Sequence, residues 1–145
     1  YALARFTAAG MQTSLKSTEA QVRSICELLY EYAEGGTPFS LQPLSYPVLV
    51  AIGNGLLAVQ TWNPQELHNL VALPDRCADK LVSAFGVLRN TAKGMTGFNI
   101  WGDDAAKLRQ AAAENAKALH FVYVLLSQAS QVITREAAFD NMSEG

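Results

Sequence analysis

The chain has 145 residues, half of them hydrophobic, and a net charge of −2 with charged residues at 17%. That length predicts one domain spanning residues 1–145, and the near-neutral charge argues against a nucleic-acid binder that relies on the basicity of the whole domain. The apolar surplus predicts either a well-filled core or apolar surface that another chain covers.

The first predicted element is a helix over residues 2–15 that is interrupted near Gly10. Thr18 and Gln21 then have the spacing of a capping box, which predicts a new helix start. Apolar residues follow at three- and four-residue steps, as on one face of a helix. Gly35-Gly36 predict its end.

The next helix is predicted over residues 47–59, after a connector at 39–46. Pro47 suits its first turn, and Gly53 and Gly55 would permit close approach of a neighbouring helix at some cost in helix stability. Apolar residues around the helix predict burial on most sides. A strand over 48–52 is the alternative.

Asn63-Pro64 predict the start of a short helix over 63–73, with Asn63 as its N-cap. A further helix is predicted over 75–90. Residues 90–102 hold three glycines and two aromatic residues, and this composition predicts the longest loop of the chain.

A long helix is predicted over 103–140, with Asp103 or Asp104 at its start. Its apolar positions alternate in steps of four and three, a seven-residue repeat typical of helices that pack lengthwise. The positions of this repeat are Leu108, Ala112, the polar Asn115, Leu119, Val122, Leu126, Ala129 and Ile133. Within 118–126 the only strongly polar residue is His120, which predicts a section covered on nearly every side. The elements together predict an all-α four-helix bundle with additional short helices.

Known catalytic motifs are absent from the sequence, including the phosphate-binding loop, the nucleophile elbow and the zinc-protease helix motif. His68 and His120 lie on different predicted helices, and no local cluster of ligands accompanies either. We interpret His120 as a packing histidine, and Cys26 and Cys77 as buried free thiols. We therefore expect no enzyme activity, metal or cofactor; a small helical enzyme is the third-ranked alternative.

We expect no membrane span, because no apolar run reaches the ~18 residues that one needs. Tyr1 is not an initiator methionine and residues 1–16 lack the plan of a signal peptide. We accordingly expect the chain to begin within a longer product.

One charge pattern suggests an anion site. No acidic residue occurs between Lys80 and Gly102, and two more basic residues follow in the first turns of the long helix. If helices 75–90 and 103–140 are antiparallel, these cations meet at one end of the bundle, where helix amino termini also favour anions. The candidate residues are Arg89, Asn90, Lys93, Lys107 and Arg109. The alternative is an ordinary solvated basic end that Asp103 and Asp104 neutralise, these two acting as helix caps rather than as a metal or acid–base pair.

Several local patterns resemble the coat proteins of rod-shaped plant viruses of the tobacco mosaic virus type. They are Gln21-Val22-Arg23 at the start of an apolar helix, Leu81-Val82-Ser83-Ala84-Phe85 leading to Arg89-Asn90, Gly102-Asp103-Asp104 before the long helix, and Thr134-Arg135 with Ala138-Phe139-Asp140 after it. The last piece is also similar to coat proteins of flexible filamentous plant viruses. The tryptophan that usually follows in the rod-shaped family is missing here.

The resemblance implies a capsid or nucleocapsid subunit that self-assembles into a helical filament around single-stranded RNA. It implies RNA contact at the five candidate residues and a subunit interface at Arg135, Phe139 and Asp140. Such binding would engage the phosphate backbone with little sequence preference. The implied partners are RNA and copies of the chain, without a membrane, and the implied locations are the virion and the host cytoplasm. The second hypothesis is a non-viral helical interaction module that docks a partner helix.

Overall fold

A computed structural model describes residues 2–39, 41–59, 61, 75–97 and 104–144; the side chains of 2–11, 75–76 and 136–144 lie outside this description. Its helices are α1 (Ala2–Ala33), α2 (Tyr46–Leu57), α4 (Asp75–Thr96) and α5 (Ala105–Glu144). No strand occurs within these ranges, so the prediction of an all-α, bundle-like fold is confirmed. The short helix predicted over 63–73 falls outside the described residues.

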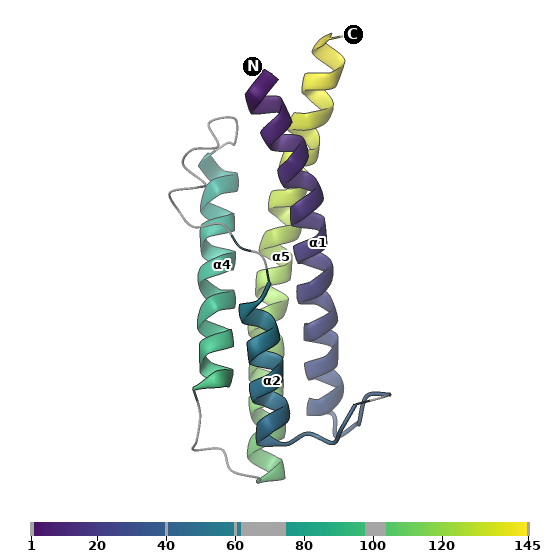
Figure 1. Cartoon of the computed structure of the whole chain (residues 1–145), viewed down its shortest axis with the longest axis vertical. Helices are drawn as coiled ribbons and strands as arrows, with labels where there is room; N and C mark the ends of the chain where they lie inside the picture. The colour runs from purple at the N-terminus through teal and green to yellow at the C-terminus, as the bar shows by residue number, and fades with distance from the viewer. Residues whose placement is uncertain (1, 40, 60, 62–74, 98–103, 145) are drawn as a thin grey trace.

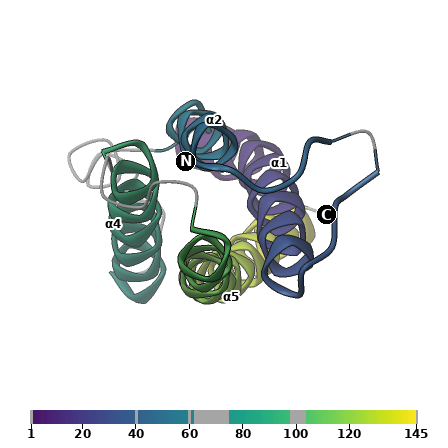
Figure 2. The same cartoon turned by 90° about the horizontal axis from the view of Figure 1, so that it is seen from below.

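The chain direction alternates from each described helix to the next along the bundle (Figure 1). Seen from one end, the helices surround a common centre (Figure 2). α5 packs along both α1 and α4, whereas α2 packs mainly on α4 and touches α1 only slightly. The carboxyl ends of α1 and α4 therefore lie at the same end of the bundle as the amino end of α5.

α1 is continuous from Ala2 to Ala33, so the interruption predicted near Gly10 and the start predicted at Thr18 are both wrong. The Thr18 hydroxyl donates to the carbonyl oxygen of Ser14 at 3.0 Å, as serine and threonine hydroxyls do inside helices. Leu15 and Val22 are fully buried on either side of Thr18. Packing of this face carries the helix through a sequence that would otherwise favour a break.

The predicted stop at Gly35-Gly36 is confirmed. Gly35 takes a φ of 86°, in the left-handed region that glycine adopts without a steric penalty. The Gly36 N–H donates to the Glu31 carbonyl at 3.0 Å, which satisfies one of the carbonyl groups that a helix end leaves open.

α2 begins after Ser45, whose hydroxyl oxygen accepts a hydrogen bond from the Val48 N–H at 3.4 Å, and Pro47 lies in the first turn. The strand alternative over 48–52 is thus wrong. The helix ends at Leu57 and buries one face only, with Leu49, Gly53 and Leu56 inside. Burial on most sides was a wrong expectation, since α2 has α4 as its main neighbour.

The two glycines of α2 have different surroundings. A Cβ at Gly53 would lie 2.8 Å from Met95 Cβ and 2.8 Å from Thr96 Cγ2, while a Cβ at Gly55 would meet nothing within 4 Å. Close approach of a neighbouring helix is therefore confirmed at Gly53 and wrong at Gly55, which is exposed to solvent.

α4 continues to Thr96, beyond the end predicted at Asn90, so the first part of the predicted 90–102 loop is helical. Leu88, Ala92 and Met95 are buried and extend the apolar face along these turns. The Thr91 hydroxyl donates to the Val87 carbonyl at 2.8 Å. Packing of this face against α2 and α5 outweighs the cost of a glycine at position 94 in the helix interior.

α5 begins after Asp104, whose Oδ1 accepts hydrogen bonds from the N–H groups of Ala106 and Lys107 at 3.0 and 3.2 Å. The capping role predicted for this carboxylate is confirmed. The seven-residue seam is confirmed too, because every apolar member of it is buried. Asn115 is half-buried and donates through Nδ2 to the Ala111 carbonyl at 2.8 Å.

The prediction that residues 118–126 are covered on nearly every side is wrong. Phe121 is 52% exposed, and Ala118, Val124 and Leu125 are half-buried. A helix with two packed neighbours covers only the faces that they touch, so the outer face of this apolar section stays uncovered within the chain.

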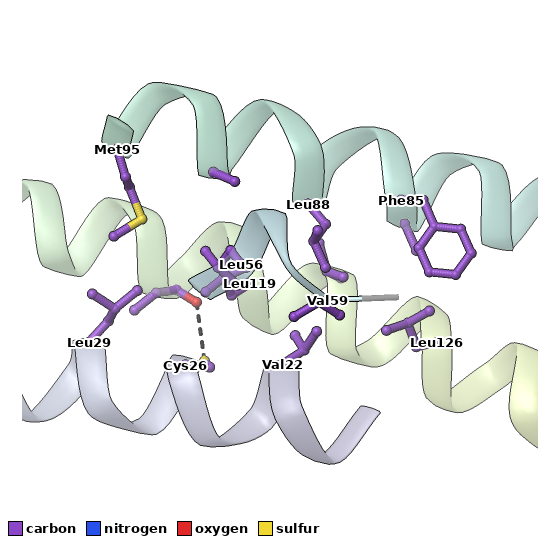
Figure 3. Packing of buried hydrophobic residues seen from close by; sticks show 14 of the residues in the cluster. Val22, Cys26, Leu29, Leu56, Val59, Phe85, Leu88, Met95, Leu119 and Leu126 are labelled. Atoms are coloured by element: carbon purple, nitrogen blue, oxygen red, sulfur yellow. Dashed lines mark hydrogen bonds between the residues drawn. The ribbon is translucent and has the colours of Figure 1, made fainter. Parts of the chain in front are cut away.

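Side chains from all the described helices meet in one core (Figure 3). Leu56 belongs to α2 and Val59 follows the end of that helix, while Phe85 and Leu88 belong to α4. The Cys26 thiol donates to the Ala116 carbonyl at 3.3 Å. Cys77 donates to the Ala129 carbonyl at 3.7 Å, and both cysteines are buried thiols outside any disulfide, as predicted. None of the described helices is apolar enough over a sufficient length to cross a membrane.

Candidate nucleic-acid interface

The candidate residues of α4 lie on its solvent-facing side. Arg89, Asn90 and Lys93 are exposed, while the neighbouring Leu88 and Ala92 are buried. Arg89 and Lys93 are four residues apart and thus neighbours on one helix face. Two cations are consequently available to a ligand that approaches the carboxyl end of α4 from outside.

Lys107 and Arg109 in the first turns of α5 are also exposed, but they do not form a pair. Residues two apart on an α-helix are separated by about 200° around its axis, so they point to nearly opposite sides. Arg109 points to the α1 side, because a Cβ at Gly35 would lie 3.4 Å from its Nη1 atom. Since the Ala106 and Lys107 N–H groups already donate to Asp104, they are not free to hold an anion.

A cavity of about 230 Å³ lies beside Arg109, between the end of α1, the connector that follows it and the start of α5. The Tyr32 hydroxyl donates to the Gln42 carbonyl at 2.8 Å and anchors this connector. Its pKa is raised, mainly because burial disfavours the phenolate. The lining residues are Tyr32, Gly35, Gly36, Thr37, Pro43, Leu44, Ala105, Leu108 and Arg109.

The five candidate residues thus gather at one end of the bundle, as the antiparallel arrangement of α4 and α5 requires (Figure 1). They do not converge on one pocket, because Arg89 and Lys93 face outward from α4 while Arg109 faces α1. Among the described residues, acidic side chains also occupy this end, including Glu31, Glu34 and Asp104. This end can therefore offer separate contacts to a polyanion, with little net positive charge.

The candidate interface residues lie near the carboxyl end of α5. Arg135 is exposed and lines a cavity between α1 and α5. Phe139 and Asp140 continue the same helix, but their side chains lie outside the described residues.

The sequence did not lead us to predict the polar side chains that lie along the seam between α1 and α5. Arg23 stacks over the Tyr123 ring, 6.0 Å from its centroid, and its Nε donates to Glu27 Oε1 at 3.1 Å. Lys16 and Glu19 lie further along the same seam. The three- and four-residue spacing of Lys16, Glu19, Arg23 and Glu27 was the available signal, but without the partner helix it reads as an ordinary exposed face.

His120, Cys26 and Cys77 are the histidine and cysteine side chains that fall within the described ranges. His120 is exposed, so its interpretation as a packing histidine is wrong; His68 lies outside the described residues. Burial raises the pKa of the Cys26 thiol, which disfavours the reactive thiolate. In the part of the chain that the structure describes, no three His, Cys, Asp or Glu side chains group as metal ligands.

Comparison with protein-family models, with curated proteins and with solved structures found no match for this chain.

Proposed function

We propose that the protein is the structural subunit of a helical capsid or nucleocapsid, which self-assembles and encloses single-stranded RNA. The observation that carries this proposal is the uncovered apolar face in the middle of α5. Phe121 is 52% exposed there, beside the half-buried Ala118, Val124 and Leu125. Grouped exposed apolar side chains of this kind commonly mark an interaction site.

Further large apolar side chains are exposed on the other described helices, namely Tyr30 on α1, Leu57 on α2 and Val82 on α4. Each is ordinary when taken alone. Because they lie on different helices, apolar contacts are available on more than one side of the bundle. Contact between two different faces of identical subunits produces a ring or an open helical filament, and this supports assembly into a filament.

The RNA part of the proposal is supported by the exposed cations at the end of α4 and α5 and by the resemblance to plant virus coat proteins. Arg89 and Lys93 are separate donors on an outer face, suited to phosphate contacts rather than to base recognition. A net charge of −2 limits repulsion among many packed copies. The proposed locations are accordingly the virion and the cytoplasm of the host cell.

The test is negative-stain electron microscopy and sedimentation velocity of the purified full chain, with and without single-stranded RNA. Filaments or large homo-oligomers are expected, and RNA should lengthen or stabilise them. Phe121→Glu should reduce assembly strongly, because it places a charge in the proposed contact. Ser24→Glu is the control, since it adds the same charge at an exposed polar position of α1.

Discrete small particles at every concentration, with no change on adding RNA, would contradict the proposal and favour the helical interaction module. Equal assembly of the Phe121→Glu and Ser24→Glu variants would show that the exposed face of α5 is not the contact. Circular dichroism of both variants checks that loss of assembly does not reflect unfolding.

A further inference from the structure

A second cavity, of about 370 Å³, opens between α1 and α5 away from the basic end. Its volume lies within the range of roughly 300–1,000 Å³ that small-ligand pockets occupy. All its lining side chains are polar or charged, although it lies in the seam of the two helices that pack most extensively. They are Lys16 and Glu19 of α1, and Ser127, Ser130, Gln131, Thr134 and Arg135 of α5.

The α5 residues of this cavity share one side of the helix because they recur at steps of three and four. Gln12 Nε2 donates to Thr134 Oγ1 at 3.1 Å, and this hydrogen bond links the two helices beside the cavity. Ser130 lines the cavity and is only 6% exposed, so this residue lies at the base of the cavity rather than at its rim. Lys16 and Arg135 are exposed and lie toward the rim.

These donors suit a tetrahedral oxyanion. The guanidinium group of Arg135 offers several N–H donors in a planar fork, and Lys16 adds a compact positive charge. The Ser130 hydroxyl and the Gln131 amide supply neutral donors. Within the described residues neither Lys16 nor Arg135 forms a salt bridge, the one ion pair there being Arg23 with Glu27.

Among the described residues that line the cavity, Glu19 is the only carboxylate, so two cations face one anion there. Burial raises its pKa, while a hydrogen bond from Ser127 and the charge of Lys16 lower it in part. The environment thus disfavours the ionised carboxylate overall. An arriving anion would compete with Glu19 for Lys16, and removal of this carboxylate should therefore strengthen anion binding.

We propose that this cavity between α1 and α5 binds a phosphate group, held by Lys16, Arg135 and the Ser130 hydroxyl. The identification of that group as an RNA phosphodiester rests on the function proposed above; binding of free phosphate does not. The site lies on the side of the bundle, between α1 and α5, whereas Arg89 and Lys93 lie on α4.

The experiment measures two probes with the full chain at low ionic strength: inorganic phosphate by titration calorimetry, and a fluorescent oligouridylate by anisotropy. Arg135→Gln and Lys16→Gln should each weaken both by about tenfold, since each removes a charge-assisted contact. Glu19→Gln should strengthen both. Lys117→Gln is the matched control, because it removes one exposed charge of α5 that belongs to neither candidate site. Thermal unfolding of each variant confirms that the fold is retained.

The proposal is overturned if Arg135→Gln and Lys16→Gln affect phosphate binding no more than Lys117→Gln does. RNA binding that Lys93→Gln weakens, while the two cavity variants leave it unchanged, would keep the proposed function and remove this site. Phosphate binding that depends on Arg135, with no RNA binding at all, would support the site and contradict the RNA-enclosing function. The salt dependence of RNA binding adds a readout, because loss of one phosphate contact lowers the slope by about one.

Discussion

Gly53 and Gly55 allow a direct test of how α2 packs on α4. Both are interior to α2, so alanine at either position should gain about 1 kcal/mol of helix propensity. At Gly55 nothing opposes this gain, because a Cβ there would meet no atom within 4 Å. Gly55→Ala should therefore stabilise the protein by about 1 kcal/mol.

At Gly53 the added methyl group would lie 2.8 Å from Met95 Cβ and 3.1 Å from the Ala92 carbonyl oxygen. Neither atom is the end of a flexible side chain, so α4 itself must move. Overpacking of this kind costs about 1–3 kcal/mol, which exceeds the propensity gain. We expect Gly53→Ala to destabilise the protein by about 1 kcal/mol, a difference of about 2 kcal/mol from Gly55→Ala.

The assay is urea unfolding followed by circular dichroism and tryptophan fluorescence, at a protein concentration low enough to prevent association. The shift of the midpoint at constant slope reports the change in stability. Equal stabilisation by the two alanines would refute the close packing of α2 on α4. Equal destabilisation would refute the exposed position of Gly55.

Asp104→Ala should lower the free energy of unfolding by about 1 kcal/mol, because two N–H groups of α5 lose their acceptor. Asp104→Asn should retain most of the stability in the same urea unfolding assay. An equal loss of stability in both variants would indicate that the charge of Asp104 matters rather than its capping. Glu19 has a raised pKa in the folded protein because burial disfavours its charged form, so the folded state holds its proton more tightly than the unfolded state. Its ionisation should lower stability as the pH rises from the ordinary glutamate value of 4.5 through the raised value. The stability of the Glu19→Gln variant should equal that of the wild type below this pH window and exceed it above the window, as measured by thermal unfolding across pH. If the stability of the variant changes with pH as that of the wild type does, the prediction is contradicted.

The long helix was predictable because its signal repeats over many turns. Leu108, Leu119 and Leu126 recur in the seven-residue pattern, and the structure buries them against α1 and α4. Asp104 was recognisable as a cap because capping depends on the residue itself and its nearest backbone neighbours. Local chemistry of this kind needs no knowledge of the remaining fold.

The breaks predicted at Thr18 and after Asn90 failed for one reason. Each rested on a local preference worth about 1 kcal/mol or less, and packing of a continuous apolar face outweighs such a preference. Leu15 and Val22 carry α1 past Thr18, and Ala92 and Met95 carry α4 past Asn90. The candidate site shows the same limit, because the sequence places Lys107 and Arg109 together while the helix turns them to opposite sides.

The sequence by itself determined the helical class, the seam of α5, the cap at Asp104 and the stop at Gly35, since each follows from periodicity or from the conformational needs of one residue. Only the tertiary structure decided which faces are covered. The sequence predicts that the apolar middle of α5 is covered on nearly every side, yet two neighbouring helices leave Phe121 exposed. The same pairing brings Lys16, Ser130 and Arg135 to one cavity, because residues more than a hundred positions apart meet only when α1 and α5 pack side by side.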